Sequence, residues 1–300
     1  MSGALLDVRK KIVSVQGTRK ITKAMQLVAA SKMRQFQKRA VSTRAYVWDL
    51  MDTLEENIGV ESLYTEKREE GEVLFVLYTS DKGLCGPLNN KLINALFRSD
   101  LWNGYTEEQR MLITIGRKGY DAARNLGVHV DKKFTGVPEK ITTIQALELI
   151  DKILEFWRNG KAKQIIFIAP HYKNSFTFYP VLKTFLPFSK EMIESNIGHI
   201  ETHHRKHKKP DPLMIYEPSK SAVISRLHEQ MVTSLFVESF LELKASEYSS
   251  RMMAMQNATD SADKVIAGLS LQYNKARQQE ITREIAELVG ASEAISSASS

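Results

Sequence analysis

The chain has 300 residues, and domains commonly have roughly 100 to 200, so the length suggests two domains. An apolar content of 43% and a charged content of 26% are ordinary for a globular protein and exclude a mainly disordered chain. No apolar run approaches the roughly 18 residues of a membrane-spanning helix, and the N-terminus lacks the pattern of a secretory signal. The single cysteine, Cys85, excludes an intrachain disulfide and fits a reducing compartment.

The positive charge is concentrated near the N-terminus. The whole chain has 42 Lys or Arg against 35 Asp or Glu, a formal charge of +7. Residues 1–44 contain eleven Lys or Arg and one acid, Asp7, which is +10, so the remaining residues together carry −3. The basic character therefore belongs to one segment.

Residues 1–58 are predicted to form one long helix. The segment has no proline, Gly17 is the only glycine in its interior, and good helix formers dominate it. Apolar residues recur with the 3-4 spacing of a seam that faces another helix, and in the middle this spacing slips to fours, which predicts local stutters. The predicted seam is Leu5, Val8, Ile12, Val15, Ile21, Met25, Ala29, Met33, Phe36, Ala40, Thr43, Val47, Leu50 and Leu54.

Residues 71–217 have the pattern of an α/β domain. Short apolar runs bounded by turn residues predict buried strands of a mostly parallel sheet, and helical patterns lie between them. The predicted strands are Val73 to Thr79, Met111 to Ile115, Val128 to Phe134 and Ile165 to Ala169, with possible edge strands at Ser175 to Phe185 and Leu213 to Glu217. The predicted helices are Leu88 to Arg98, Lys118 to Asn125 and Thr142 to Trp157. The domain is expected to be Rossmann-like.

Residues 219–290 are predicted to form a second long helix, with residues 291–300 as a flexible tail. Ser219 is a suitable N-cap, and Gly290 stands where a helix would stop. The predicted seam is Ile224, Leu227, Met231, Ser234, Glu238, Leu241, Ala245, Tyr248, Met252, Met255, Thr259, Ala262, Ile266, Leu269, Tyr273, Ala276 and Glu280. Because the two helices leave and re-enter one central domain, they are expected to form an antiparallel coiled coil within the chain. The alternative is that both pack flat on a globular body.

The first strand-to-helix turn, Ser80 to Asn89, is one candidate site. It lacks both G-x-G-x-x-G and the P-loop pattern, so it fits a tight glycine-rich turn better than a phosphate cradle at a helix N-terminus. Cys85 lies within it and could be a nucleophile. No histidine or acid accompanies Cys85 in the pattern that nucleophilic catalysis requires, which favours a packing role.

The His-rich tract 199–209 is a second candidate site. His203 and His207 have the spacing of a helical metal pair, but the tract also has four Lys or Arg, which oppose a metal ion. A solvated basic loop is the better interpretation, with acidic lipid headgroups or an acidic partner as a possible contact. The sequence has no paired-carboxylate, Ser/His/Asp or zinc constellation, so no catalytic, metal or cofactor site is expected.

The basic N-terminal helix fits two kinds of partner. Lysines and arginines can neutralise the phosphates of a nucleic acid. However, much of this helix must be buried, and the chain lacks the signatures of common DNA-binding modules. An acidic protein surface fits equally well on composition alone.

Five sequence blocks resemble the gamma subunit of bacterial F-type ATP synthases. They are Lys20 to Met33, Ser80 to Gly86, Tyr216 to Pro218, Arg251 to Asp260 and Tyr273 to Thr282. The blocks follow the order of that family, and they extend over essentially the whole chain. Three features depart from the family pattern: Pro87 after Cys-Gly, Ser261 after Asp260, and the basic tract from His203 to Lys209.

The resemblance implies a central-stalk rotor subunit that couples rotation of the membrane c-ring to ATP synthesis. The subunit would be noncatalytic, present in one copy, and would contact three alpha subunits, three beta subunits, epsilon and the c-ring. It would be peripheral, at the cytoplasmic face of the bacterial inner membrane, with no nucleic-acid partner, no small-molecule substrate and no cofactor. The coupling ion, proton or sodium, would be selected by c-ring residues outside this chain. A basic coiled-coil nucleic-acid-binding protein is the alternative function.

The resemblance also implies contact residues. Lys23, Met25, Arg251, Arg277, Gln278 and Thr282 match family positions that contact the catalytic ring or the facing helix. Tyr216 and Glu217 match the family's foot on the c-ring.

Overall fold

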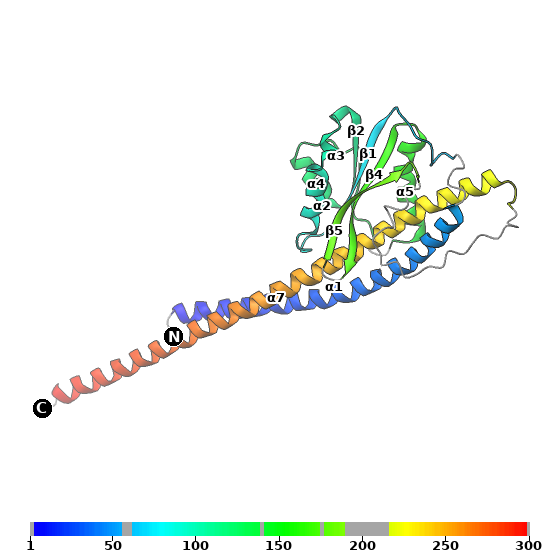
Figure 1. Ribbon diagram of the computed structural model, residues 1–300. Coiled ribbons are helices and arrows are strands. Elements are labelled where there is room, and N and C mark those ends of the chain that lie inside the picture. The colour runs from blue at the N-terminus through cyan, green and yellow to red at the C-terminus, as the bar shows by residue number, and fades with distance from the viewer. Residues whose placement is uncertain (1–2, 56–61, 139–140, 175–176, 190–215, 299–300) are drawn as a thin grey trace. The chain divides into compact units, whose positions relative to one another are not determined.

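The computed structural model describes residues 3–55, 62–138, 141–174, 177–189 and 216–298 (Figure 1). The helices are α1 (Gly3–Glu55), α2 (Leu88–Phe97), α3 (Asp100–Asn103), the 3-10 helix η1 (Glu107–Gln109), α4 (Arg117–Asn125), α5 (Thr143–Arg158) and α7 (Lys220–Ala298). The strands are β1 (Glu72–Tyr78), β2 (Arg110–Ile115), β3 (Lys132–Phe134), β4 (Ala162–Asn174) and β5 (Thr177–Leu186). Contacts divide the chain into two units, the helix-pair unit (residues 1–28 and 252–300) and the α/β unit (residues 29–251).

The α/β unit is built on one five-stranded sheet in the order β3-β2-β1-β4-β5. Strand β1 pairs in parallel with β2 and β4, β2 pairs in parallel with β3, and β5 is an antiparallel edge strand. Residues from Val73 to Tyr78 in β1 are fully buried, because helices cover both faces of the sheet. The continuous apolar run therefore correctly predicted a buried parallel strand. The predicted Rossmann-like domain is confirmed.

Helices flank the sheet on both sides. In Figure 1, α2, α3 and α4 lie on one side and α5 lies on the other. Thr142 caps α5, since its side chain accepts a hydrogen bond from the backbone N–H of Gln145 at 3.3 Å. At the start of α4, Gly116 has a φ of +96°, and a Cβ there would lie 2.1 Å from the carbonyl oxygen of Thr79. The helix therefore begins in close contact with the end of β1, where only glycine fits.

Helices α1 and α7 pack antiparallel in both units. In the helix-pair unit, Arg19 contacts Asp263 and Gln26 contacts Gln256, so numbers rise along one helix as they fall along the other. In the α/β unit, Phe36 stacks on Tyr248 with ring centroids 5.6 Å apart. The predicted antiparallel pairing of the N- and C-terminal helices is confirmed.

The seam of α1 differs from the prediction at its centre. Ile21 is 63% exposed, whereas Thr22 is 9% exposed and its hydroxyl lies 2.9 Å from that of Thr259. With the polar residues Arg19, Thr22 and Gln26 in the seam, the heptad spacing continues without interruption. The predicted stutter at Ile21 is therefore wrong, because an apolar pattern cannot detect seam positions whose polar side chains pair across the interface.

Residues 240–251 of α7 are buried around the whole circumference of the helix. Burial on all sides is typical of a helix that other elements enclose, whereas a helix in a two-helix seam buries only one stripe. In the helix-pair unit the buried positions return to a single stripe that includes Met255, Thr259 and Ala262. Packing on a globular body, the alternative, thus describes the helix segments within the α/β unit, where residues such as Leu50 and Phe236 also join the core. A two-helix seam describes the helix-pair unit.

Other element boundaries differ in detail. Ser219 caps α7 as predicted, since its Oγ accepts from the backbone N–H of Ala222 at 3.2 Å. Helix α7 continues past Gly290 to Ala298, so the predicted end at Gly290 is wrong; a helical glycine costs about 1 kcal/mol and does not by itself stop a helix. The predicted strand from Val128 is limited to β3, because Val128 N–H closes the end of α4 by donating to Ala123 O at 2.9 Å. The sequence pattern did not predict α3 or η1.

Two predictions fall outside the described residues. They are the basic tract 199–209 and most of the possible edge strand at 213–217.

Candidate partner-binding surfaces

The glycine-rich turn after β1 is closed by its own hydrogen bonds. Asn89 Oδ1 accepts from the backbone N–H of Ser80 at 3.0 Å, and Asn89 Nδ2 donates to Cys85 Sγ at 3.1 Å. Asp81 already places a carboxylate at the start of α4, where it accepts from the backbone N–H of Arg117 at 3.0 Å. Since Cys85 is 2% exposed, these contacts support a tight, packed turn rather than a phosphate cradle or an accessible nucleophile.

Arg251 holds this turn against α7. Its Nη2 donates to Gly83 O at 3.3 Å and pairs with Glu247 Oε1 at 2.9 Å. Next to it, Ser250 Oγ donates to Cys85 O at 2.5 Å. Arg251 is only 8% exposed, so in this chain it contacts its own turn.

The remaining predicted ring-contact residues lie in the helix-pair unit. Lys23 is exposed on α1, whereas Met25 is half-buried. Arg277, Gln278 and Thr282 are exposed on α7, and Thr282 Oγ1 donates to Gln278 O at 2.9 Å. The structure thus brings Gln278 and Thr282 together on an open face of α7.

The basic residues of α1 fall into two groups. Arg9, Lys10, Lys11, Lys20, Lys23, Arg34, Lys38 and Arg39 are exposed. The other three point toward α7: Arg19 pairs with Asp263, Lys32 donates to Tyr248 Oη at 3.4 Å, and Arg44 pairs with acidic residues described below. The sequence analysis treated the positive charge as one surface. In the structure, the charged groups of these three residues contact side chains of α7.

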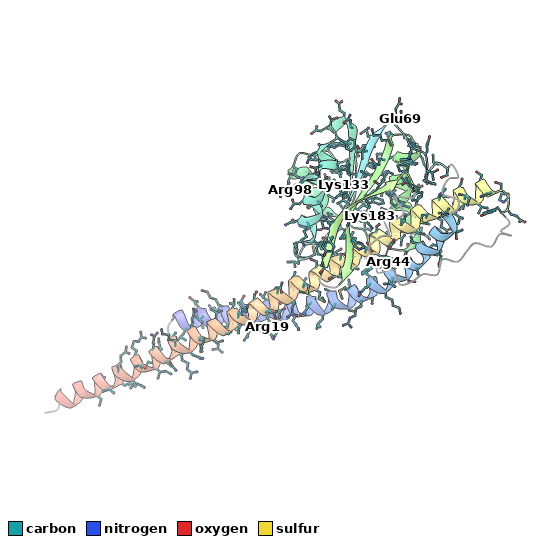
Figure 2. The ribbon with its side chains drawn as sticks, viewed as in Figure 1. Arg19, Arg44, Glu69, Arg98, Lys133 and Lys183 are labelled. Atoms are coloured by element: carbon teal, nitrogen blue, oxygen red, sulfur yellow. The ribbon has the colours of Figure 1, made fainter. Side chains whose placement is uncertain are left out.

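Arg44 belongs to a buried ionic cluster that sequence reasoning missed. Its Nε lies 3.1 Å from Glu238 Oε1, and its Nη2 pairs with Glu242 Oε1. On the sheet side, His171 Nδ1 of β4 lies 3.6 Å from Glu242 Oε2, and Lys183 of β5 lies close enough to act on both carboxylates. Figure 2 labels two members of the cluster, Arg44 and Lys183. The one sequence signal was Glu238, a carboxylate in an otherwise mostly apolar seam.

The two carboxylates of this cluster titrate in opposite directions. Burial raises the pKa of Glu238 above its ordinary value, and the neighbouring Glu242 adds to the rise while Arg44 opposes it. Burial also acts to raise the pKa of Glu242, but the hydrogen bond with His171 and the charges of Lys183, His171 and Arg44 outweigh it and lower that pKa. Glu242 is therefore the carboxylate that the surrounding cations hold ionised.

The predicted foot residues lie just before α7. Tyr216 is half-buried against the core, and Lys220 Nζ lies 5.8 Å from the centre of its ring. Glu217 is exposed. The structure thus places an exposed carboxylate next to an aromatic side chain that packs on the core.

The predicted contact residues that the structure describes are exposed, except for the buried Arg251 and the half-buried Met25 and Tyr216. Across the ranges that the structure describes, no group of three or more His, Cys, Asp or Glu side chains is placed to hold a metal ion. None of the described helices has an apolar stretch that could span a bilayer. The chain thus combines a pair of long antiparallel helices, with charged side chains exposed, and a Rossmann-like α/β unit.

Comparison with known proteins agrees with this architecture. Residues 4–295 match the family model described as ATP synthase. The chain is 33% identical to the ATP synthase gamma chain of Heliobacterium modesticaldum, over 96% of this chain and 98% of that one. It is 30% identical to the sodium ion specific ATP synthase gamma chain of Acetobacterium woodii, over 98% of this chain and 100% of that one. The fold matches a chain in the OSCP/F1/c-ring structure of the Euglena gracilis mitochondrial ATP synthase, with a TM-score of 0.66 at 17% identity, covering 98% of this chain and 95% of that chain.

The chain belongs to the ATP synthase gamma-chain family. The predicted membership, in the gamma subunits of ATP synthases, is thereby confirmed. Nothing in these comparisons supports the nucleic-acid alternative.

Proposed function

We propose that this chain couples proton flow through a membrane c-ring to ATP synthesis and catalyses no step itself. The observation that carries this proposal is the family match over residues 4–295, together with exposed helix surfaces in both units. One copy would lie within a ring of three alpha and three beta subunits, and epsilon and the c-ring would bind at the other end. It would be a peripheral protein at the cytoplasmic face of the bacterial inner membrane, without a cofactor, a small-molecule substrate or nucleic acid.

The proposed mechanism depends on asymmetry. Two paired helices of different sequence present different side chains in every direction around their common axis. Three identical catalytic sites around such a shaft would each contact a different surface. Only a difference in contact free energy can give otherwise equal sites different conformational equilibria. Rotation of the shaft would then change the state of each site in turn.

The exposed residues of the helix-pair unit would supply these contacts. Lys23 would present its positive charge to an acidic surface of a beta subunit, and the half-buried Met25 would offer its remaining apolar surface. Arg277, Gln278 and Thr282 would meet the catalytic ring from α7, where their side chains are exposed. Arg251 would contribute through the turn that it holds, because its own guanidinium is buried.

The proposed foot would bind the c-ring. Tyr216 packs on the core and would transmit load into the α/β unit, while the exposed Glu217 would pair with a cation of the ring. Driving vesicles that contain the assembled complex with a proton gradient, and separately with a sodium gradient, tests the ion. ATP synthesis that requires sodium would contradict the proton assignment and leave the rotor role intact.

Substitution of Arg277 or Gln278 tests the ring contact. We expect Arg277→Ala and Gln278→Ala each to lower coupled ATP synthesis more than they lower the amount of assembled complex, because both side chains point away from the rest of the described chain. Gln272→Ala is the matched control, since Gln272 is equally exposed on α7 but faces another direction. Synthesis and rotation torque equal to the unsubstituted complex would remove these two residues from the proposed contact.

A further inference from the structure

Five ionisable side chains from four elements meet in the buried ionic cluster. Arg44 comes from α1, Glu238 and Glu242 from α7, His171 from β4 and Lys183 from β5. The side chains of Arg44, Glu238, Glu242 and His171 are 16%, 14%, 8% and 14% exposed, respectively. Burying so many charged groups is costly unless each is paired, so the arrangement requires a reason beyond stability.

The geometry of Arg44 is specific to one alignment of the two helices. Glu238 and Glu242 are one helical turn apart on α7, and the single guanidinium of Arg44 reaches both. A displacement of α1 along α7 by one turn, about 5.4 Å, would leave one carboxylate without this partner.

The apolar contacts nearby do not select one alignment in the same way. Phe36, Ala40 and Val47 are buried neighbours of Arg44 along the α1 seam. Apolar burial is non-directional, so it stabilises several alignments with similar strength. A buried polar or ionic group at a seam position is a known means of selecting one register at some expense of stability.

The cluster also reaches the sheet. Glu242 is shared, because Arg44 contacts its Oε1 while His171 of β4 faces its Oε2 at 3.6 Å. Lys183 on β5 adds its charge from the neighbouring strand. A single carboxylate thus joins α1, α7 and the two antiparallel strands at one edge of the sheet.

We propose that Arg44, Glu238 and Glu242 form a register lock that fixes α1 at one axial position on α7, and that His171 and Lys183 tie this position to the sheet. Within the α/β unit, the lock makes the segments of α1 and α7 and the sheet respond to load together. Resting on the proposed rotor function, this inference assigns Arg44 as a positioning residue for coupling.

Two variants separate the lock from ordinary stability. Arg44→Met leaves both carboxylates without the guanidinium and is expected to destabilise the fold. Arg44→Met combined with Glu238→Gln removes the link between the helices while Glu242 keeps His171 and Lys183, so this double variant is expected to fold and assemble. Arg44→Lys keeps the charge but cannot reach two carboxylates in the same fork geometry, and it is expected to be intermediate. Arg39→Met is the matched control, because Arg39 is an exposed arginine of the same helix.

The first measurement determines the axial position of α1 relative to the sheet, and it uses the full chain. Spin labels at Val41→Cys in α1 and Arg98→Cys beside α2, both exposed positions of the α/β unit, report the distance between the helix and the sheet domain. We expect one narrow distance for the otherwise unsubstituted chain and for Arg39→Met. In the double variant we expect a broadened distribution, with a second population displaced by about one helical turn, roughly 5 Å.

The second measurement is coupling in reconstituted ATP synthase. The double variant is expected to hydrolyse ATP normally while losing ion pumping and ATP synthesis, with partial recovery in Arg44→Lys. A single narrow distance together with unchanged pumping in the double variant would overturn the lock. Failure of the unsubstituted chain to assemble into an active ATP synthase would instead refute the proposed function, and the distance measurement would still decide the lock.

Discussion

His228 shows how one buried side chain can set the acid stability of the α/β unit. Its residue is 2% exposed on α7, its ring centre lies 6.0 Å from that of Phe188, and its Nδ1 has no hydrogen-bond partner among the described residues. Burial lowers the pKa of this imidazole below the ordinary value of 6.5. The unfolded chain therefore binds the proton more readily than the folded chain.

The direction of this shift gives a pH prediction. Stability from the neutral imidazole is fully present above the unfolded pKa, near 6.5, and is lost as pH falls through the lowered folded pKa. When the pH falls from about 7.5 to about 5.5, we expect the free energy of unfolding to decrease less in His228→Phe than in the unsubstituted chain. The difference is at most about 1.4 kcal/mol, the limit for one proton over one pH unit below 6.5. Urea unfolding at both pH values measures the difference.

The control for this prediction is His129→Gln, since the side chain of His129 is 87% exposed. It controls for the general effect of replacing a histidine. Parallel pH dependence in His228→Phe and the unsubstituted chain would contradict the assignment of His228.

Local residue roles were more predictable than distant pairs. Ser219 and Thr142 could be identified from sequence because a helix cap depends only on residues a few positions away. The partners of Arg44 lie 194 and 198 residues along the chain, so no local pattern could name them. The inward orientation of three basic residues of α1 was missed for the same reason.

At the scale of elements, the polar section of the α1–α7 seam is the main departure from the predicted pattern. Gln26 donates to Gln256 across the helix-pair unit, and Gln256 in turn donates to Asp260 Oδ1 at 2.7 Å. Thr22 and Thr259 meet one turn away. These pairs explain why apolar spacing predicted the α7 seam well but misplaced the centre of the α1 seam.

The glutamine pair gives a second prediction. Gln256→Leu alone should lower the free energy of unfolding by about 1–3 kcal/mol, because it leaves the Gln26 amide without its partner in a part-buried site. Adding Gln26→Leu should recover most of this loss, since two apolar side chains suit a helix seam. Denaturant unfolding of both single variants and the double variant forms the required cycle.

Additive losses in the double variant would argue against a pairwise contact between these glutamines. Gln272→Leu, on an exposed position of the same helix, controls for the general effect of adding a leucine to α7.

At the scale of the whole molecule, the end of α7 differs from the other described helices in its exposure to solvent. Every residue from 281 to 292 is exposed. Among them, Ile281, Ile285, Leu288 and Val289 are 42%, 55%, 71% and 52% exposed. Most helical stability comes from packing of an apolar face, so this stretch depends on a partner that the chain itself does not provide within the described ranges.

Hydrogen exchange tests this dependence. We expect amides of 281–292 to exchange quickly in the isolated chain and roughly a hundredfold more slowly after assembly with alpha and beta subunits, a change of about 3 kcal/mol in local opening free energy. Amides from Met255 to Ala262, whose seam positions are buried, should be protected in both states. Equal exchange of 281–292 before and after assembly would show that this stretch does not enter the ring.

The architecture could be predicted from sequence more fully than the contact residues. Two long heptad patterns on either side of alternating strands and helices leave few possible folds, and the sheet and the helix pair both appeared as expected. Residues such as Arg277 and Gln278 are proposed to contact other chains, so neither periodicity nor the fold of this chain can identify them. Only the resemblance to a family pointed to them.

The pairing of the two ends also has a consequence for synthesis. Arg19 and Asp263 are 244 residues apart, and Thr22 and Thr259 are 237 apart. At translation rates of about 5–20 residues per second, roughly 12–50 s pass between the appearance of one partner and the other. The strands of the α/β unit lie within one continuous stretch of sequence, so this unit can fold during that interval. Residues 3–28 of α1 have no partner helix until the C-terminal part of α7 has been synthesised. We therefore expect the helix pair to close last, once the ribosome has delivered nearly the entire chain.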